Sequence, residues 1–170
     1  MPLSMYQASI PVFVRALNVL TALLDKAEAH AAQNGLDLST LVNARLAPDM
    51  YPLSGQIQRA SDASKFAVKR LTGLDAPSFE DVETTFPELR KRIADTVAWL
   101  QSVPASALEG SESKSVQLTF GDFKPTFQGD AYLLSFALPN FYFHITTAYG
   151  ILRHSGVPIG KLDFLGPYPG

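Results

Sequence analysis

Cysteine is absent from the 170-residue chain. Disulfide bonds, thiolate nucleophiles and cysteine-bound zinc or iron–sulfur clusters are therefore excluded. Oxygen and imidazole groups are left as the protein ligands for any metal ion. A chain without cysteine also fits a reducing compartment, and we expect a cytoplasmic location.

An excess of positive charge is lacking as well. The 14 Lys and Arg residues are outnumbered by 16 Asp and Glu residues, which gives a formal net charge of -2. This balance counts against nucleic acid or an anionic membrane surface as the main partner. No uninterrupted apolar run approaches the roughly 20 residues that span a bilayer. The N-terminal "MPLSMYQASI" has no basic region before an apolar run, so it predicts neither a signal peptide nor an anchor.

Internal repeats and low-complexity segments are also missing. The apolar fraction is 46% and the charged fraction is 18%, which are ordinary values for a packed globular core. A chain of this length is most naturally one domain, and we expect a single domain over residues 1–170.

Amphipathic helices account for most of the apolar residues in the first half of the chain. The first is expected from Ser4 to about Ala32, with Pro11 inside it and Gly35 as its C-terminal cap. A short helical piece follows over residues 39–45. The second long helix is expected to begin near Pro52 and to end at Gly73.

Two more helices are expected in the second half. The third begins at Ser78, a hydroxyl cap followed by acidic residues, and stops before Pro104. Pro87 in its middle either kinks it or divides it in two. The last helix begins between residues 130 and 139 and ends at Gly156. Between these helices, "KSVQLTFGDFKPTFQG" alternates apolar and polar residues around a Gly-Asp pair and predicts a small β-hairpin.

These elements predict an all-α fold, an up-and-down-like four-helix bundle with a small β-hairpin inserted before the last helix. Aromatic residues are frequent around the hairpin and the last helix, where they fit core packing, a pocket mouth or a subunit interface. A homodimer formed through the bundle helices is therefore one possible partner arrangement.

The last helix carries the most informative polar residues. Asn140 and His144 lie one turn apart on an otherwise apolar and aromatic helix, so their side chains share one face. A buried imidazole must hydrogen-bond or ligate something, because leaving it unsatisfied costs about 1–3 kcal/mol. Gln56 and Asp62 of the second helix are the candidate partners. One interpretation is a core hydrogen bond that orders the bundle, and the other is a ligand-binding or acid–base role for His144.

The segment "HITTAYGILRHSG" resembles the last helix of the DinB/YfiT-like superfamily of metalloenzymes. Within that resemblance, the chain is most similar to a branch defined as a domain of unknown function. The shared features are "DMYPL" before the second helix, "RLTG" after it, and "PNFYFHITTAYGILRHSGV" running into "IGKLDFLG". The resemblance covers nearly the whole chain, and it implies a DinB-like four-helix bundle.

The superfamily's metal centre typically uses one histidine from the second helix and a pair spaced i, i+4 on the last helix, and it holds nickel, zinc or another divalent ion. The resemblance places His144 at the second position of the pair and Asn140 at the first, while the second-helix position falls near Gln56. It therefore implies His144 as a metal ligand in a degenerate site.

Two functional hypotheses follow. In the first, the chain is a small-molecule-binding protein or a metal-dependent enzyme of thiol transfer or hydrolysis. His144, Asn140, Gln56 and Asp62 would then line a site between the second and last helices. In the second, it is a non-enzymatic structural or interaction bundle, in which His144 is a satisfied core residue.

Overall fold

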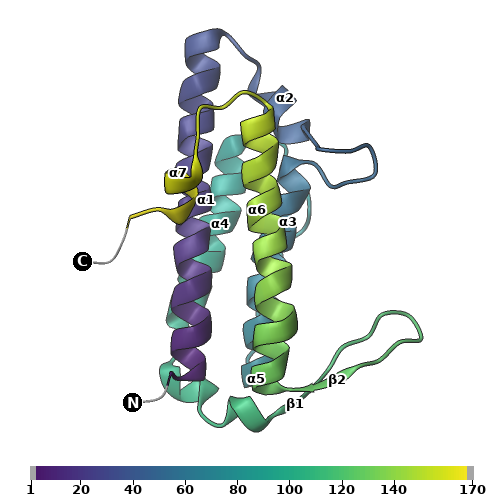
Figure 1. Ribbon diagram of the computed structural model, residues 1–170. Helices are drawn as coiled ribbons and strands as arrows, with labels where there is room; N and C mark the ends of the chain where they lie inside the picture. Colours follow the sequence, from purple (N-terminus) through teal and green to yellow (C-terminus); the bar gives the residue numbers. More distant parts are fainter. Residues whose placement is uncertain (1–2, 168–170) are drawn as a thin grey trace.

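Four long helices packed side by side make up the body of the molecule (Figure 1). The computed structural model describes residues 3–167. The long helices are α1 (Met5–Asn34), α3 (Leu53–Thr72), α4 (Phe86–Ser102) and α6 (Leu138–His154). The short elements are α2 (Leu38–Asn43), η1 (Ala105–Leu108), η2 (Ser111–Ser113), β1 (Ser115–Gln117), β2 (Thr126–Gln128), α5 (Gly129–Tyr132), η3 (Leu133–Ala137) and α7 (Lys161–Leu165). The expected four-helix bundle is confirmed.

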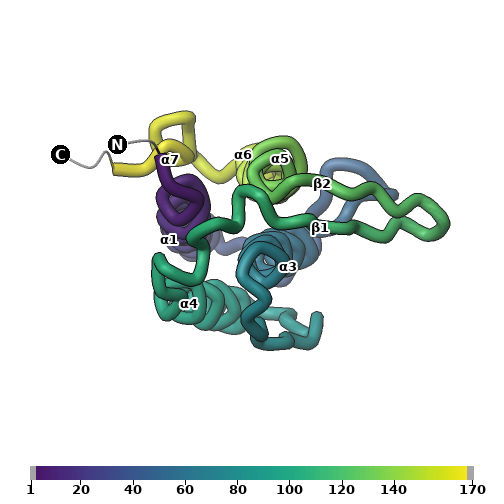
Figure 2. Tube along the Cα trace, turned by 90° about the horizontal axis from the view of Figure 1, so that it is seen from below, coloured from purple at the N-terminus to yellow at the C-terminus, as the bar shows by residue number. Residues whose placement is uncertain are grey.

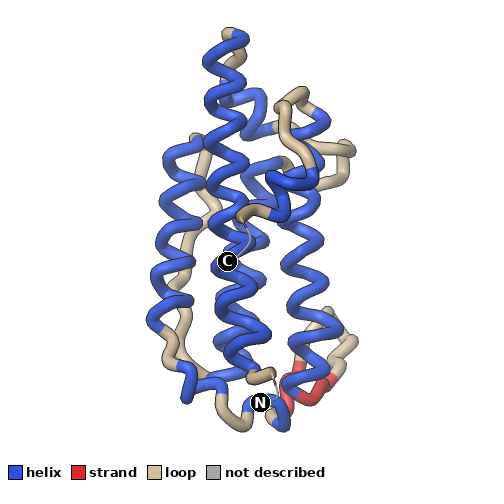
Figure 3. Tube along the Cα trace, turned by 60° about the vertical axis from the view of Figure 1, so that its left-hand side comes forward, coloured by secondary structure: helices blue, strands red, loops and turns tan. Residues whose placement is uncertain are grey.

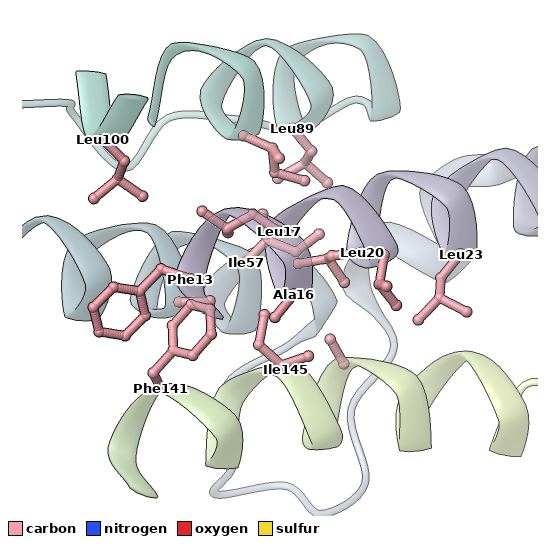
Figure 4. Close-up of a cluster of buried hydrophobic side chains, with 14 of the residues drawn as sticks. Phe13, Ala16, Leu17, Leu20, Leu23, Ile57, Leu89, Leu100, Phe141 and Ile145 are labelled. Carbon is pink, nitrogen blue, oxygen red and sulfur yellow. The ribbon is translucent and has the colours of Figure 1, made fainter. Parts of the chain in front are cut away.

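The core runs along the axis of the bundle, where the apolar faces of the four helices meet (Figure 4). Phe13 of α1 and Phe141 of α6 are fully buried there, and their rings meet edge to face with centroids 4.9 Å apart. Ile57 of α3 and Leu89 of α4 complete the contact between helices. Burying one such side chain stabilises the fold by about 1.5–3 kcal/mol, so this interior holds the helices together.

The connection between α3 and α4 differs from the expected one. Residues 73–84 form no helix and run back along α3, because Lys65 donates to the carbonyl of Pro77 at 3.0 Å and Gln58 donates to Glu83 at 2.9 Å. We call this segment the crossover. It returns the chain to the end of the bundle where α3 began, so α3 and α4 run in the same direction (Figure 3). The up-and-down connectivity was therefore wrong, and one long crossover replaces one short loop.

Helix α4 begins at Phe86 rather than at Ser78. Its N-cap is Thr85, whose hydroxyl accepts from the backbone N–H of Glu88 while the Glu88 carboxylate accepts from the backbone N–H of Thr85. Pro87 lies in the first turn, where its missing N–H costs no hydrogen bond. Pro87 therefore neither kinks nor divides the helix, because it helps to start it.

The expected hairpin is present, and it leads directly into the last helix. Strands β1 and β2 pair antiparallel, and the hairpin projects sideways from the end of the bundle (Figure 2). Gly129 then begins α5, and a π-helical turn, η3, joins α5 to α6 just before Pro139. Proline has no N–H for the usual i→i−4 bond, so a wider turn at this point fits its chemistry.

Helix α1 is long and apolar enough, by length and composition, to cross a membrane, and it is the one helix in residues 3–167 of which this is true. Half of its most apolar window is buried inside the bundle. Core helices of bundles have this composition, so the packing of α1 accounts for its hydropathy without a bilayer.

Candidate functional site

His144 and Gln56 form a hydrogen-bonded pair between α6 and α3. His144 Nδ1 lies 2.8 Å from Gln56 Oε1, across 88 residues of sequence. Gln56 is almost completely buried, with 1% of its surface exposed, whereas His144 is half-buried. The predicted contact between these two residues is confirmed, and it makes the polar centre of the α3–α6 interface.

The orientation of Gln56 determines which nitrogen of His144 carries the proton. The Gln56 side-chain amide donates through Nε2 to the backbone carbonyl of Tyr51 at 3.2 Å, which turns its carbonyl oxygen toward His144. A carbonyl oxygen only accepts, so His144 Nδ1 must be the donor. The lone pair of the neutral ring is therefore on Nε2.

His144 Nε2 is reached by solvent. No side chain within residues 3–167 hydrogen-bonds to it, and it does not belong to the buried side-chain atoms that lack a partner. The hydrogen-bonded chain thus runs from the Tyr51 carbonyl through the Gln56 amide to the His144 imidazole. It ends in an accessible acceptor, His144 Nε2. A hydrogen-bond donor or an electrophile can approach it from outside.

Burial and, to a lesser extent, the positive charge of Arg59 on the next turn of α3 together lower the pKa of His144 from 6.5 to about 4. The imidazole is therefore neutral at pH 7. A general base works best when its pKa is close to the working pH. A ring with a pKa near 4 is a hydrogen-bond acceptor under these conditions and only a weak base.

One aromatic ring lies beside His144, and a second belongs to the residue that anchors Gln56. The rings of Phe143 and His144 meet edge to face, with centroids 5.3 Å apart, and 57% of Phe143 is exposed. Tyr51, whose carbonyl anchors Gln56, is exposed to the same extent, and the guanidinium of Arg59 lies over its ring at 5.9 Å. Asn140 is half-buried one turn before His144, and within the described part of the chain its amide has no hydrogen-bond partner. The surface around His144, between α3 and α6, therefore combines polar acceptors with exposed aromatic rings.

Asp62, the fourth predicted site residue, lies elsewhere. Its carboxylate binds Arg92 of α4 at 3.0 Å and Lys65 at 3.2 Å, on the side of α3 that faces α4 and the crossover. Six residues separate Gln56 from Asp62, which places them about 120° apart around a helix. The expectation that Asp62 joins His144 was therefore wrong, because the two residues of α3 face different neighbours.

The sequence interpretation did not include the residues that bind Asp62. We call Asp62, Lys65, Glu83 and Arg92 the charged cluster. Arg92 binds Glu83 at 3.0 Å and the carbonyl of Glu80 at 3.0 Å, in addition to Asp62. Burial lowers the pKa of Lys65 from its usual 10.5, and the charge of Asp62 opposes that effect. The sequence did contain a signal for this cluster, because Lys65 and Arg92 occupy core-facing positions of the predicted helices. Such cations are buried only when they are paired, so acidic partners could have been expected.

A superfamily-type nickel or zinc centre does not fit this chain. His144 is the one imidazole at the site, and Asn140 and Gln56 offer neutral amide oxygens, which are weak ligands for these ions. Gln56 Oε1 is moreover occupied by His144 Nδ1–H. Within residues 3–167, no group of three or more His, Asp or Glu side chains is arranged to hold a metal ion. The implied role of His144 as a tight metal ligand thus lacks the other ligands that it needs.

Comparison with known proteins defines the class of the fold. The crystal structure of a DinB family member protein from Shewanella denitrificans superposes with a TM-score of 0.91 and 40% sequence identity, over 98% of this chain and 94% of that one. The bundle is therefore DinB-like, as the resemblance implied. No protein in the curated set matches the chain. The family model described as domain of unknown function DUF1993 matches residues 5–165, and the chain belongs to that family.

Proposed function

We propose that this protein binds a small aromatic molecule that carries an O–H or N–H donor, on the face between α3 and α6. His144 Nε2 accepts the hydrogen bond, and the exposed rings of Phe143 and Tyr51 contact the aromatic body. The observation that carries the proposal is the hydrogen bond from His144 Nδ1–H to Gln56, which leaves an accessible acceptor at a fixed position.

The chemistry of the pair favours binding over catalysis. The imidazole is neutral and weakly basic, with a pKa of about 4, and its proton-bearing nitrogen is already engaged. Asn140, one turn away, adds an amide that can donate to or accept from the same ligand. By the resemblance, the site occupies the position of the superfamily's metal centre, and we propose that it offers hydrogen bonds in place of metal coordination.

An NMR titration with phenol tests this function, with anisole as the matched probe that lacks the donor. We expect phenol to shift the Nε2 resonance of His144 and the ring signals of Phe143, and anisole to leave the Nε2 resonance in place. His144→Leu removes the acceptor and keeps an apolar side chain between α3 and α6, at a cost of about 1–3 kcal/mol for the unpaired Gln56 oxygen. In this variant the Phe143 ring shifts should become the same for phenol and anisole.

Identical shifts for phenol and anisole would contradict the proposal, and so would phenol shifts confined to residues away from the α3–α6 face. Titration of Zn²⁺ or Ni²⁺ into the same samples tests the remaining alternative. Stoichiometric, tight binding of either ion that His144→Leu abolishes would support the metal-dependent hypothesis instead.

A second candidate function is self-association through the hairpin. Phe120 and Phe123 at its tip are 50% and 66% exposed, and their rings stack with centroids 6.5 Å apart. A projecting arm with an apolar tip suits contact with a second copy of the chain, through the hairpin instead of the bundle helices that the sequence suggested for a homodimer. His144 would then have a structural role only.

Sedimentation velocity of Phe123→Ser distinguishes this candidate. The wild type should sediment as a dimer and the variant as a monomer, while Leu162→Ser, which removes an equally exposed apolar side chain from α7, should remain dimeric. A wild type that is monomeric up to high concentration would exclude this candidate.

A further inference from the structure

We infer that a second cleft, at the end of the bundle where α1 begins, binds a small organic cation with an apolar body, such as an alkylammonium ion. We call it the basal cleft. It is lined by the first turns of α1, by the segment from η1 to η2, and by α5 with η3. These elements meet at the end of the bundle from which the hairpin projects (Figure 1). The inference does not depend on the function proposed for His144.

The basal cleft has the size and walls of a ligand site. Its volume is about 710 Å³, within the range of roughly 300–1,000 Å³ that small-molecule sites occupy. Leu108 and Leu133 form its floor and are almost completely buried, and Met5 and Tyr6 form half-buried walls. Leu134 is 62% exposed at the rim. An alkyl or aryl group can therefore leave water by entering the cleft.

The charge of the basal cleft is of one sign. Glu109, Glu112 and Asp130 line it, and among its described lining residues there is no lysine, arginine or histidine. Asp130 already accepts the backbone N–H of Ala131 at 2.6 Å. Glu109 and Glu112 are exposed and accept no hydrogen bond from a side chain within residues 3–167. These two carboxylates, which have no cationic partner among the described residues, lie beside apolar walls and complement a molecule with an ammonium group and an apolar body.

The two sides of the basal cleft are held in place by a close backbone contact. A Cβ atom at Gly129 would lie 1.8 Å from the carbonyl oxygen of Ser111, so only glycine permits this approach of α5 to η2. The π-helical turn η3 follows and supplies Leu133 and Leu134 to the cleft. Turns of this kind are frequent at functional sites. The cleft is therefore formed before a ligand arrives, which lowers the entropic cost of binding.

Calorimetric titration with hexylamine, which is protonated at pH 7, tests the inference, with hexanol as the neutral probe of the same length. We expect hexylamine to bind more tightly than hexanol. The double variant Glu109→Gln/Glu112→Gln changes exposed residues only, and it should weaken hexylamine binding about three- to ten-fold and leave hexanol unchanged. Ala105→Trp, also at an exposed position, should block both probes by filling the cleft.

Equal affinity for the two probes in the wild type would overturn the inference. The absence of binding would do so as well, and so would hexylamine binding that survives both the double variant and Ala105→Trp. His144→Leu separates this inference from the proposed function, because that variant should lose phenol discrimination and keep hexylamine binding.

Discussion

Helix α3 contributes to two polar centres that differ in how completely their groups are paired. The face toward α4 and the crossover carries Asp62 and Lys65 of the charged cluster, and the face toward α6 carries Gln56. Arg92 in the charged cluster contacts three carboxylates and one carbonyl. His144 in the other centre makes one hydrogen bond, through Nδ1.

The difference separates a structural role from a functional one. Lys65 and Arg92 are buried with their charges paired, and they tie the crossover to α3 and α4. Among the described residues, Arg92 Nε is the one buried side-chain nitrogen or oxygen without a hydrogen-bond partner, and it is closed off from solvent. A ligand therefore cannot join this network without displacing a partner. The neutral pair is cheaper to bury, because uncharged groups lose less hydration than ions do, and it leaves Nε2 open. Chemistry with an outside molecule is therefore expected at Gln56 and His144, and rigidity is expected from the charged cluster.

The largest effect is expected from removing the central cation of the charged cluster. Arg92→Ala leaves Asp62 and Glu83 without their main partner, and breaking a buried pair in this way costs about 3–5 kcal/mol. Urea denaturation should show that loss. The matched control is Lys91→Ala, since the Lys91 side chain is 75% exposed and, within residues 3–167, pairs only with Asp95; its loss should cost less than about 0.5 kcal/mol. Similar costs for the two variants would show that the charged cluster has no special structural role.

The second effect is the loss of the amide between α3 and α6. Gln56→Ala leaves the Nδ1–H of His144 and the carbonyl of Tyr51 without a partner, which should cost about 1–3 kcal/mol in the same denaturation experiment. Gln101→Ala, at an exposed position of α4, is the control and should be close to neutral. A neutral Gln56→Ala would mean that water replaces the amide at no cost.

The third effect depends on pH. His144 has a pKa of about 4 when folded and about 6.5 in the unfolded chain, so between these values the unfolded state binds a proton that the folded state excludes. Stability is therefore lost as pH falls from 6.5 toward 4. With an allowance for partial exposure, we expect the wild type to lose about 1–2 kcal/mol more than His144→Gln between pH 7 and pH 4. Parallel stability curves for the two proteins would contradict the low pKa.

Much of the fold could be predicted from local signals. Apolar periodicity located the four long helices, and Gly35 and Gly73 end α1 and α3 in the left-handed conformation that glycine favours. The start of α4 was missed because two segments have the same cap signature, a hydroxyl residue followed by acidic ones. Contacts of the crossover with Lys65 and Arg92 decide between them, and a local pattern does not contain such distant contacts.

The candidate site was predictable in part. The resemblance placed Gln56 and His144 together, and the structure confirms that pairing. Asp62 was assigned to the same site although helical geometry places it about 120° away from Gln56. The role of the Tyr51 carbonyl was beyond sequence reasoning, because a backbone atom carries no residue signature. That carbonyl nevertheless determines the orientation of the amide and hence the tautomer of the imidazole.

The sharpest test of the comparison is Gln56→Glu, and its result is read as the pKa of His144. Like Gln56→Ala, this variant loses the donor to the Tyr51 carbonyl, so its stability is not the quantity compared. A carboxylate at this position would accept from His144 Nδ1–H and stabilise the charged imidazolium, whereas the uncharged amide oxygen accepts the same bond and stabilises the imidazolium much less. The pKa of His144 should therefore rise by about 1–3 units from its value near 4. The pH dependence of the His144 Hε1 shift in an NMR titration measures it directly.

Gln101→Glu adds the same charge at an exposed position of α4, and it should leave the titration of His144 where it is in the wild type. If both glutamate variants move the pKa of His144 equally, the carboxylate acts through the general field of the protein and not through a bond to Nδ1. The inference that Nδ1 carries the proton and Nε2 the lone pair would then no longer be supported. A rise confined to Gln56→Glu would instead show that one buried side chain of α3 controls the acceptor offered to a ligand, independently of the charged cluster on the helix's other face.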